Sequence, residues 1–316
     1  MNDELHVLFG AGQVGNYLAR ILLKANKRVR IAKRSPKGVP EGVEVIQGDA
    51  GDREFCIKAA EGATTVYHCM NPPYYAHIWA ELVPKYMENL IAAAGSAGAK
   101  LVVLDNVYML GKPNGKPLDE DSPLNPCSKK GTIRARAAER LFEAHKKGEV
   151  IATTGRASDF YGPGGKLTFL GDYFWKPVVA GKTARVFVNP DTIHTYHYIP
   201  DVAKGLMTLG CAEKDVYGKP WMLPCPPVET MRVLVNRFSK FNGEEIKLGR
   251  IPKWIMKLTG VFVPLVKELN EMSYQWDEPF IINDKRFRER FKQEPTDVNE
   301  AAKATVEWAK EYYNDK

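Results

Sequence analysis

The chain has 316 residues, of which 44% are hydrophobic and 26% charged, and these proportions exclude a disordered or fibrous protein. Its net charge of +7 is spread over pairs and triplets of basic residues, which predicts local anion binding and excludes a nucleic-acid-binding arm. The length suits two domains.

The first half of the chain alternates short apolar runs with amphipathic stretches. The apolar runs predict strands at 6–9, 29–32, 43–46, 65–68, 100–104 and 150–154. The amphipathic stretches predict helices at 14–24, 53–60, 77–97 and 134–146. Repeated strand–helix–strand units pair in parallel, with right-handed crossovers and helices on both faces. We therefore predict an α/β fold, a doubly wound, Rossmann-like parallel sheet over residues 1–160 with a return segment near 186–215.

After Tyr161 the alternation of apolar runs and amphipathic stretches is less regular. It predicts helices at 169–180, 228–241 and 296–313, strands at 185–188 and 194–199, a helix opened by Pro200 and a short strand at Trp221. We assign 161–185 and 216–316 to a smaller α/β substrate-binding domain. The segment 251–266 is apolar with spaced lysines, and packing against the core of this domain is its expected role. A lid over substrate, a homodimer surface and a membrane-adhering helix stay open.

The five cysteines form no C-x-x-C pair, which predicts reduced thiols and argues against a disulfide framework or a zinc site. The chain enters an apolar strand almost at once, without a basic region and a hydrophobic signal segment. The longest nearly apolar run falls short of a membrane span. Together these features predict a cytoplasmic protein without an integral membrane segment.

A G-x-G-x-x-G pattern, formed by Gly10, Gly12 and Gly15, follows the first strand and opens the first helix. In this context the first glycine permits a tight turn, the second lets the backbone approach a pyrophosphate, and the third lets helix and strand pack closely. Gln13 and Val14 complete the turn, where the helix N-terminus offers N–H groups to the anion. The pattern predicts a dinucleotide site.

The end of the second strand indicates which dinucleotide is bound. An NAD site carries an acidic residue there for the ribose 2′-hydroxyl, whereas this chain has Lys33, Arg34 and Ser35. Two cations and a hydroxyl suit a 2′-phosphate, so NADP(H) is the predicted cofactor. A solvated basic strand end is the alternative interpretation. Asp49, after the third strand, is expected at the adenine amino group or at a helix N-terminus.

These motifs resemble the extended short-chain dehydrogenase/reductase superfamily, in particular its NAD-dependent epimerase/dehydratase-like and atypical members. The other matching segments are Gly48-Asp49, Val66-Tyr67-His68, Leu101-Val102-Val103-Leu104 with Gly111, the run from Arg156 to Gly164, and the run from His197 to Ala203. The resemblance covers roughly residues 5–210. It implies a nicotinamide cofactor across the sheet edge and a substrate in the cleft under the second domain.

The catalytic signature departs from that superfamily, whose members use Ser or Thr after the fifth strand and a Tyr-x-x-x-Lys pair on the next helix. Here Asn106 falls at the hydroxyl position, and Lys130 and Arg134 have the i, i+4 spacing without a tyrosine. Arg134 could hold ribose hydroxyls or a substrate carboxylate, and Lys130 could transfer a proton. A solvated helix start is the alternative for this pair. Tyr108 and Tyr161 are rival proton donors.

The loop after the fourth strand is expected to face the cofactor, with Met70 and Asn71 at its ribose. Tyr74 and Tyr75 follow as expected substrate-pocket residues, and an aromatic plug between domains is equally compatible with them.

His194 is a further candidate for the substrate pocket, together with Tyr161. His194 and His197 stand three apart, so on one strand they would point to opposite faces. No nearby carboxylate or cysteine completes a coordination sphere, and no metal site is predicted.

The predicted function is an NADP(H)-dependent oxidoreductase that transfers hydride to or from a small or medium organic carbonyl or hydroxyl compound. Its predicted chemistry set is Lys130, Arg134, Asn106 and Tyr108. A non-catalytic NADP(H)-binding sensor stays open, because such a protein needs no catalytic tyrosine. A nucleotide-sugar epimerase or dehydratase is the third hypothesis.

Overall fold

The computed structural model describes residues 4–314, which divide into two compact units. The first comprises residues 4–111, 123–157 and 202–223, and the second comprises residues 112–122, 158–201 and 224–314. The return segment of the first unit thus begins at 202 instead of near 186 and ends at 223 instead of 215. Residues 112–122, expected in the dinucleotide domain, belong to the second unit.

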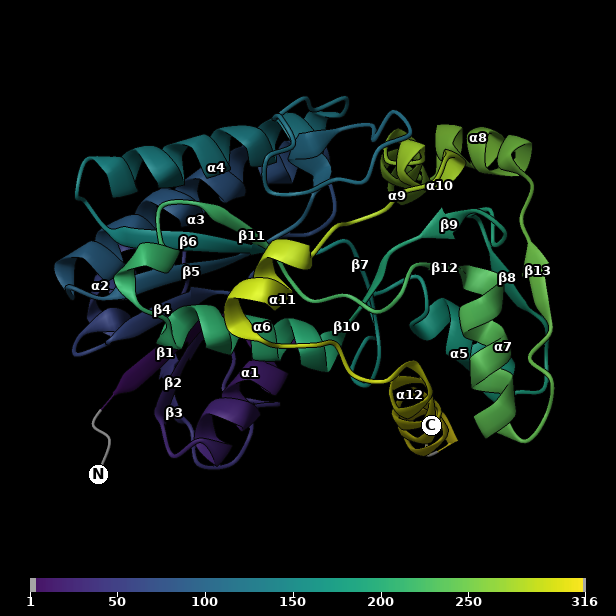
Figure 1. Cartoon of the computed structure of the whole chain (residues 1–316), viewed down its shortest axis with the longest axis horizontal. Coiled ribbons are helices and arrows are strands. Elements are labelled where there is room, and N and C mark those ends of the chain that lie inside the picture. Colours follow the sequence, from purple (N-terminus) through teal and green to yellow (C-terminus); the bar gives the residue numbers. More distant parts are fainter. Residues whose placement is uncertain (1–3, 315–316) are drawn as a thin grey trace. The chain divides into compact units, whose positions relative to one another are not determined.

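A seven-stranded parallel sheet forms the centre of the first unit (Figure 1). Its strands are β1 (Leu5–Phe9), β2 (Arg28–Lys33), β3 (Glu44–Gln47), β4 (Thr65–His68), β5 (Lys100–Asp105), β6 (Ile151–Arg156) and β11 (Pro220–Met222). Their order is β11-β6-β5-β4-β1-β2-β3, which confirms the predicted doubly wound α/β fold. The order reverses between β1 and β4, and such a sheet binds ligands beyond the carboxyl ends of the strands at this point.

Helices cover both faces of the sheet (Figure 1). One face carries α2 (Arg53–Ala60), α3 (Ala76–Ser96) and α4 (Lys129–Lys146), and the other carries α1 (Gln13–Lys24) and α6 (Ile199–Cys211). The main hydrophobic core lies between the sheet and helices α2, α3 and α4. Phe9, Val66 and Val103 are fully buried there. Burial of alternate strand residues against these helices fixes the sheet register and therefore aligns the carboxyl ends of β1, β4 and β5.

Two elements of this unit differ from expectation. Helix α4 begins at Lys129, five residues before the expected start, because the Ser128 hydroxyl accepts the backbone N–H of Gly131 at 3.0 Å and caps the helix. The short strand at Trp221 is β11, which pairs with β6 at the edge of the large sheet and not within the second domain.

The second unit combines three two-stranded sheets with helices. The pairs are β7 (Asp159–Tyr161) with β10 (Tyr196–Tyr198), β9 (Ile193–His194) with β12 (Glu229–Thr230), and β8 (Ala184–Val186) with β13 (Leu248–Arg250). The helices are α5 (Asp172–Val179), α7 (Met231–Asn242), α8 (Lys253–Phe262), α9 (Pro264–Glu271), α10 (Tyr274–Asp277), α11 (Lys285–Phe291) and α12 (Val298–Asn314). An aromatic core of Tyr161, Phe174, Trp175 and Phe238 joins α5, α7 and β7.

The apolar segment 251–266, expected to pack against the core of this domain, is only partly covered, with Ile255, Met256, Leu265 and Val266 half-buried. All of its residues are described, and among those of α8 and α9 only Gly260 is buried. Within residues 4–314, no helix is both long and apolar enough to cross a membrane.

Candidate cofactor and active site

The turn between β1 and α1 carries the three glycines of the dinucleotide pattern. Gly10 has a φ of 103°, in the left-handed region, and a Cβ built on it would lie 2.8 Å from the Cys69 carbonyl. A Cβ on Gly15 would lie 2.1 Å from the Gly10 oxygen, so the fold itself requires glycine at both positions. Gly12 is exposed, and a Cβ there would meet none of the described atoms within 4 Å. Open space beside exposed backbone is what a pyrophosphate needs to approach.

Gly12 is also the N-cap residue of α1. Gln13 and Val14 form the first turn of this helix, and no side chain in the described part of the protein caps it. The leading N–H groups of a helix, together with the positive end of its dipole, bind anions. The local backbone therefore fits a dinucleotide pyrophosphate.

The two cations at the carboxyl end of β2 lie differently. Lys33 is half-buried, and its Nζ donates a hydrogen bond to the Lys37 carbonyl at 2.7 Å. Arg34 and Ser35 are exposed, and Gln47 Nε2 fixes the Arg34 backbone by donating to its carbonyl at 2.9 Å. Lys33 therefore shapes the loop, whereas Arg34 presents its guanidinium to solvent.

Two carboxylates follow β3. Asp52 Oδ1 accepts the N–H groups of Glu54 and Phe55 at 2.9 and 3.2 Å and so caps α2. Asp49 is exposed, and its Oδ1 accepts the Gly51 N–H at 2.8 Å. Asp52 therefore fills the capping role at α2, one of the two roles expected for Asp49.

The segment after β4 lies against the glycine turn, because a Cβ on Gly10 would also come within 2.9 Å of the Met70 side chain. His68 is buried at the end of β4, and its Nδ1 accepts the Met70 N–H at 3.2 Å. Burial, with a smaller effect of the Arg134 charge, lowers the pKa of His68 to about 3. The neutral imidazole thereby fixes the turn that leads to Asn71.

Arg134 connects this loop to α4. Its Nη2 donates to Asn71 Oδ1 at 2.9 Å, its Nη1 lies 3.5 Å from Asp105 Oδ1, and its guanidinium lies over the Trp79 ring at 4.9 Å. Arg134 and Asp105 are both buried, and burial raises the pKa of Asp105 although the Arg134 charge opposes this. No role for Asp105 was predicted from the sequence. The signal in the sequence for a role of Asp105 was a carboxylate at the end of the largely apolar strand β5.

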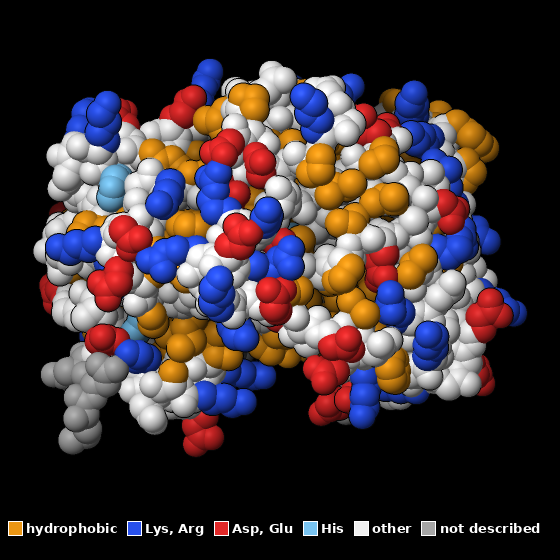
Figure 2. All heavy atoms as spheres, viewed as in Figure 1, with side chains coloured by type: hydrophobic (Ala, Val, Ile, Leu, Met, Phe, Trp, Pro, Cys, Tyr) orange, Lys and Arg blue, Asp and Glu red, His pale blue; other side chains and the backbone are white. Residues whose placement is uncertain are grey.

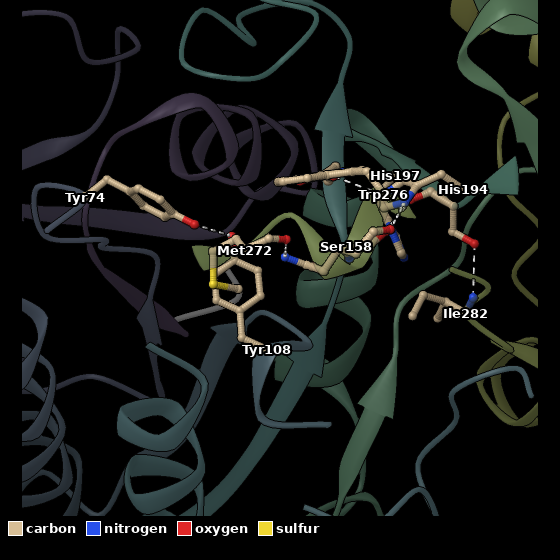
Figure 3. Close-up of polar contacts among 11 residues, drawn as sticks. Tyr74, Tyr108, Ser158, His194, His197, Met272, Trp276 and Ile282 are labelled. Carbon is tan, nitrogen blue, oxygen red and sulfur yellow. Dashed lines mark hydrogen bonds and ion pairs between the residues drawn. The ribbon is translucent and has the colours of Figure 1, made fainter. Parts of the chain in front are cut away.

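Lys130 lies one helical turn before Arg134 and is fully buried. Its Nζ lies 4.7 Å from the centre of the Tyr74 ring, and the Tyr74 hydroxyl donates to the Tyr108 hydroxyl at 3.2 Å (Figure 3). Tyr108 belongs to a short 3-10 helix (Tyr108–Leu110), and its N–H donates to Asn106 Oδ1 at 3.0 Å. Lys130, Tyr74, Tyr108 and Asn106 are thus connected by direct contacts.

The structure shows how the expected active-site residues are buried and hydrogen-bonded. Lys130 and Arg134 are buried against aromatic rings and do not form a solvated helix start. Asn106 uses its carbonyl oxygen to hold the Tyr108 turn, which leaves its amide group as the donor. Tyr75, at the N-cap of α3, is half-buried with its ring 5.8 Å from that of His77.

The remaining candidates, Tyr161 and His194, belong to the second unit. Tyr161 is buried against Tyr198 and Phe238, and burial raises the pKa of its phenol. His194 Nε2 lies 2.9 Å from Asp159 Oδ2, which also accepts the Trp276 indole N–H at 2.7 Å (Figure 3).

His194 and His197 lie on separate strands, β9 and β10. The His197 ring accepts the Ser158 N–H at 3.1 Å. Over residues 4–314, no cluster of three or more His, Cys, Asp or Glu side chains could hold a metal ion.

A family model matches the part of the chain that contains the dinucleotide turn, the β4 loop and the start of α4. The model of the NAD dependent epimerase/dehydratase family matches residues 7–217. The chain belongs to this family, which confirms the resemblance seen in the sequence.

Curated relatives share part of the chain. A 3-diazoavenalumate denitrifying reductase from Streptomyces sp is 30% identical over 169 residues, which are 48% of this chain and 55% of that protein. A UDP-glucose 4-epimerase from Streptomyces lividans is 26% identical over 148 residues, which are 42% of this chain and 45% of that protein. Each match spans about half of the relative's length.

Solved structures resemble the whole fold. The UDP-glucuronic acid 4-epimerase from Bacillus cereus, solved with UDP-glucuronic acid and NAD, has a TM-score of 0.80 at 15% identity. The match covers 98% of this chain and 100% of that chain.

Proposed function

We propose that this protein is an NADP(H)-dependent oxidoreductase that reduces a small or medium organic carbonyl compound, or oxidises the corresponding alcohol. The observation that carries the proposal is the contact chain Lys130–Tyr74–Tyr108, which joins the first turn of α4 to the segments after β4 and β5. A buried cation beside two linked phenols provides proton-transfer chemistry that a binding protein does not need.

The bound nicotinamide would supply or accept the hydride at the substrate carbon. Tyr108 would give the carbonyl oxygen its proton during reduction and take it back during oxidation, while the Tyr74 hydroxyl donates to the Tyr108 oxygen. The Lys130 ammonium is attracted to the face of the Tyr74 ring and would stabilise negative charge on the phenols. Arg134 would hold a ribose hydroxyl or a substrate carboxylate, since Asp105 and Asn71 fix its guanidinium.

The choice of NADP(H) rests on Arg34. Its guanidinium is exposed at the end of β2, where a 2′-phosphate would be recognised, and the carboxylate typical of an NAD site is absent from the sequence at 33–35. The reductase among the relatives supports hydride transfer to a substrate.

A nucleotide-sugar epimerase is the second candidate, because one relative is a UDP-glucose 4-epimerase and similar structures contain NAD. Epimerisation by this fold needs reversible proton transfer and retained NAD. The absent Tyr-x-x-x-Lys tyrosine and the basic end of β2 both disfavour it.

Calorimetric titration with NADPH and NADH tests the cofactor, and turnover of NADPH with a panel of carbonyl compounds and enones tests the reaction. Loss of a charge-assisted contact costs about 1.5–3 kcal/mol. Arg34→Ala should therefore weaken NADPH binding by roughly tenfold to a hundredfold and leave NADH binding nearly unchanged.

The matched control is Lys24→Ala, at the exposed end of α1 opposite the glycine turn, which should change neither affinity. Equal affinity of the wild-type protein for both cofactors would remove the NADP(H) assignment. Tight NADPH binding with no turnover of any panel compound would favour a sensor. Turnover of a UDP-sugar without net oxidation of the cofactor would favour the epimerase.

A further inference from the structure

Helix α8 in the second unit presents a broad apolar face to solvent. Trp254, Leu258, Val261 and Phe262 are 66%, 58%, 75% and 79% exposed. Their spacing places all four on one side of the helix. Figure 2 shows hydrophobic side chains beside basic ones at the position of α8, at the upper right.

The other side of α8 is fixed to its neighbours. Gly260 is buried, and a Cβ there would lie 2.6 Å from Asn270 Nδ2 of α9. The same Nδ2 donates to the Met256 carbonyl at 2.9 Å, and Lys253 forms an ion pair with Asp277 of α10. The apolar face is therefore held outward by contacts on the opposite side of the helix.

The charges on α8 indicate what this face binds. The helix contains Lys253 and Lys257 and no acidic residue. Lys253 is engaged by Asp277. On a helical wheel Lys257 borders the apolar face, so its ammonium group can contact an anionic surface that the apolar side chains enter. A second copy of the chain packed by a two-fold axis would instead bring the lysine edges of both copies to one interface.

We propose that α8 is a docking surface for an anionic lipid bilayer. Its four apolar side chains would insert at the level of the headgroups, and Lys257 would contact the lipid phosphates. A helix of ten residues is too short to span a bilayer of about 30 Å, so α8 would lie in the plane of the interface. The net charge of +7 favours the approach of the protein to such a surface.

Vesicle flotation tests the proposal with the full-length protein. Vesicles of phosphatidylcholine with one third phosphatidylglycerol should carry the protein upward at low salt, and pure phosphatidylcholine vesicles should carry at least about tenfold less. High salt should reduce binding to the anionic vesicles. The double variant L258D/F262D should lose about tenfold or more of the binding, and Lys257→Gln should reduce the preference for anionic vesicles.

The matched control is L167D/Y173D, which places two aspartates at exposed apolar positions of the same unit outside α8 and should bind as the wild type does. Circular dichroism melting checks that every variant is folded. Failure to float with anionic vesicles, or an equal loss in the control, would overturn the proposal. A dimer in sedimentation velocity that L258D/F262D abolishes, without vesicle binding, would assign the face to a second copy of the chain.

Discussion

Two cations of α4 lie on aromatic faces: Lys130 on the Tyr74 ring and Arg134 on the Trp79 ring. Each contact offsets part of the cost of removing a cation from water, and Arg134 gains Asp105 as a buried counter-charge as well. These side chains are therefore held in fixed positions before any ligand binds, as a catalytic group requires.

Tyr108 and Lys130 are the two possible proton donors of this site, and substitutions distinguish between them. Tyr108→Phe should lower kcat about a hundredfold or more with cofactor affinity nearly unchanged, because a lost general acid or base costs on that scale. Steady-state kinetics with NADPH and a substrate found in the carbonyl panel would measure it. Tyr161→Phe serves as the control and should retain turnover, since its ring is buried in the aromatic core of the second unit.

Lys130→Met completes this comparison. Full turnover in Tyr108→Phe together with a hundredfold loss in Lys130→Met would transfer the proton-donor role to the lysine. If both variants keep full turnover, the contact chain has no catalytic role.

At the scale of elements, the sequence correctly predicts those helices, strands and turns that a local residue pattern defines. The glycine turn and the strand 65–68 lie where predicted, because a strand–turn–helix motif and an apolar run carry their own signal. The start of α4 was missed because apolar periodicity begins only near Ile133, whereas the Ser128 cap precedes it. Burial of Lys130 and Arg134 depends on rings from the β4 loop and the first turn of α3, about 55 residues away in the sequence, which no local pattern reveals.

The glycine turn supports a prediction that separates binding from folding. Gly12→Val should abolish cofactor binding without lowering the melting temperature by more than a few degrees, since a Cβ there meets none of the described atoms within 4 Å. Gly15→Ala should instead destabilise the protein, because its Cβ would overlap the Gly10 carbonyl. Calorimetry with NADPH and thermal melts of both variants measure the two effects. Micromolar binding retained by Gly12→Val would show that the turn is only structural.

At the scale of the whole molecule, the first unit buries two histidines in their neutral form. Burial lowers the pKa of His6 to about 4, with a smaller effect of Lys27, and that of His68 to about 3. In the unfolded chain both titrate near pH 6.5. The unfolded state therefore takes up more protons below that pH, so this contribution to the free energy of unfolding is present above pH 6.5 and is lost as the pH falls toward 3–4.

We therefore expect urea denaturation to show a lower stability at pH 5 than at pH 7, with each histidine contributing up to about 2 kcal/mol. His68→Asn keeps an acceptor for the Met70 N–H but does not titrate, so it should remove about that much of the loss. His77→Asn, the same substitution at an exposed position, is the control. An unchanged pH dependence in His68→Asn would contradict the buried neutral state.

The path of the chain has a consequence for how the protein is made. The chain passes between the two units five times, and the edge strand β11 lies at residues 220–222, after two segments of the second unit. During synthesis on the ribosome, six strands of the large sheet emerge while the outer edge of β6 is still unpaired. Roughly sixty further residues must be synthesised before β11 can pair with this edge. An unpaired edge strand recruits other strands, so a transcript truncated before residue 220 should yield an aggregating product, and neither unit can be expressed as one uninterrupted gene fragment.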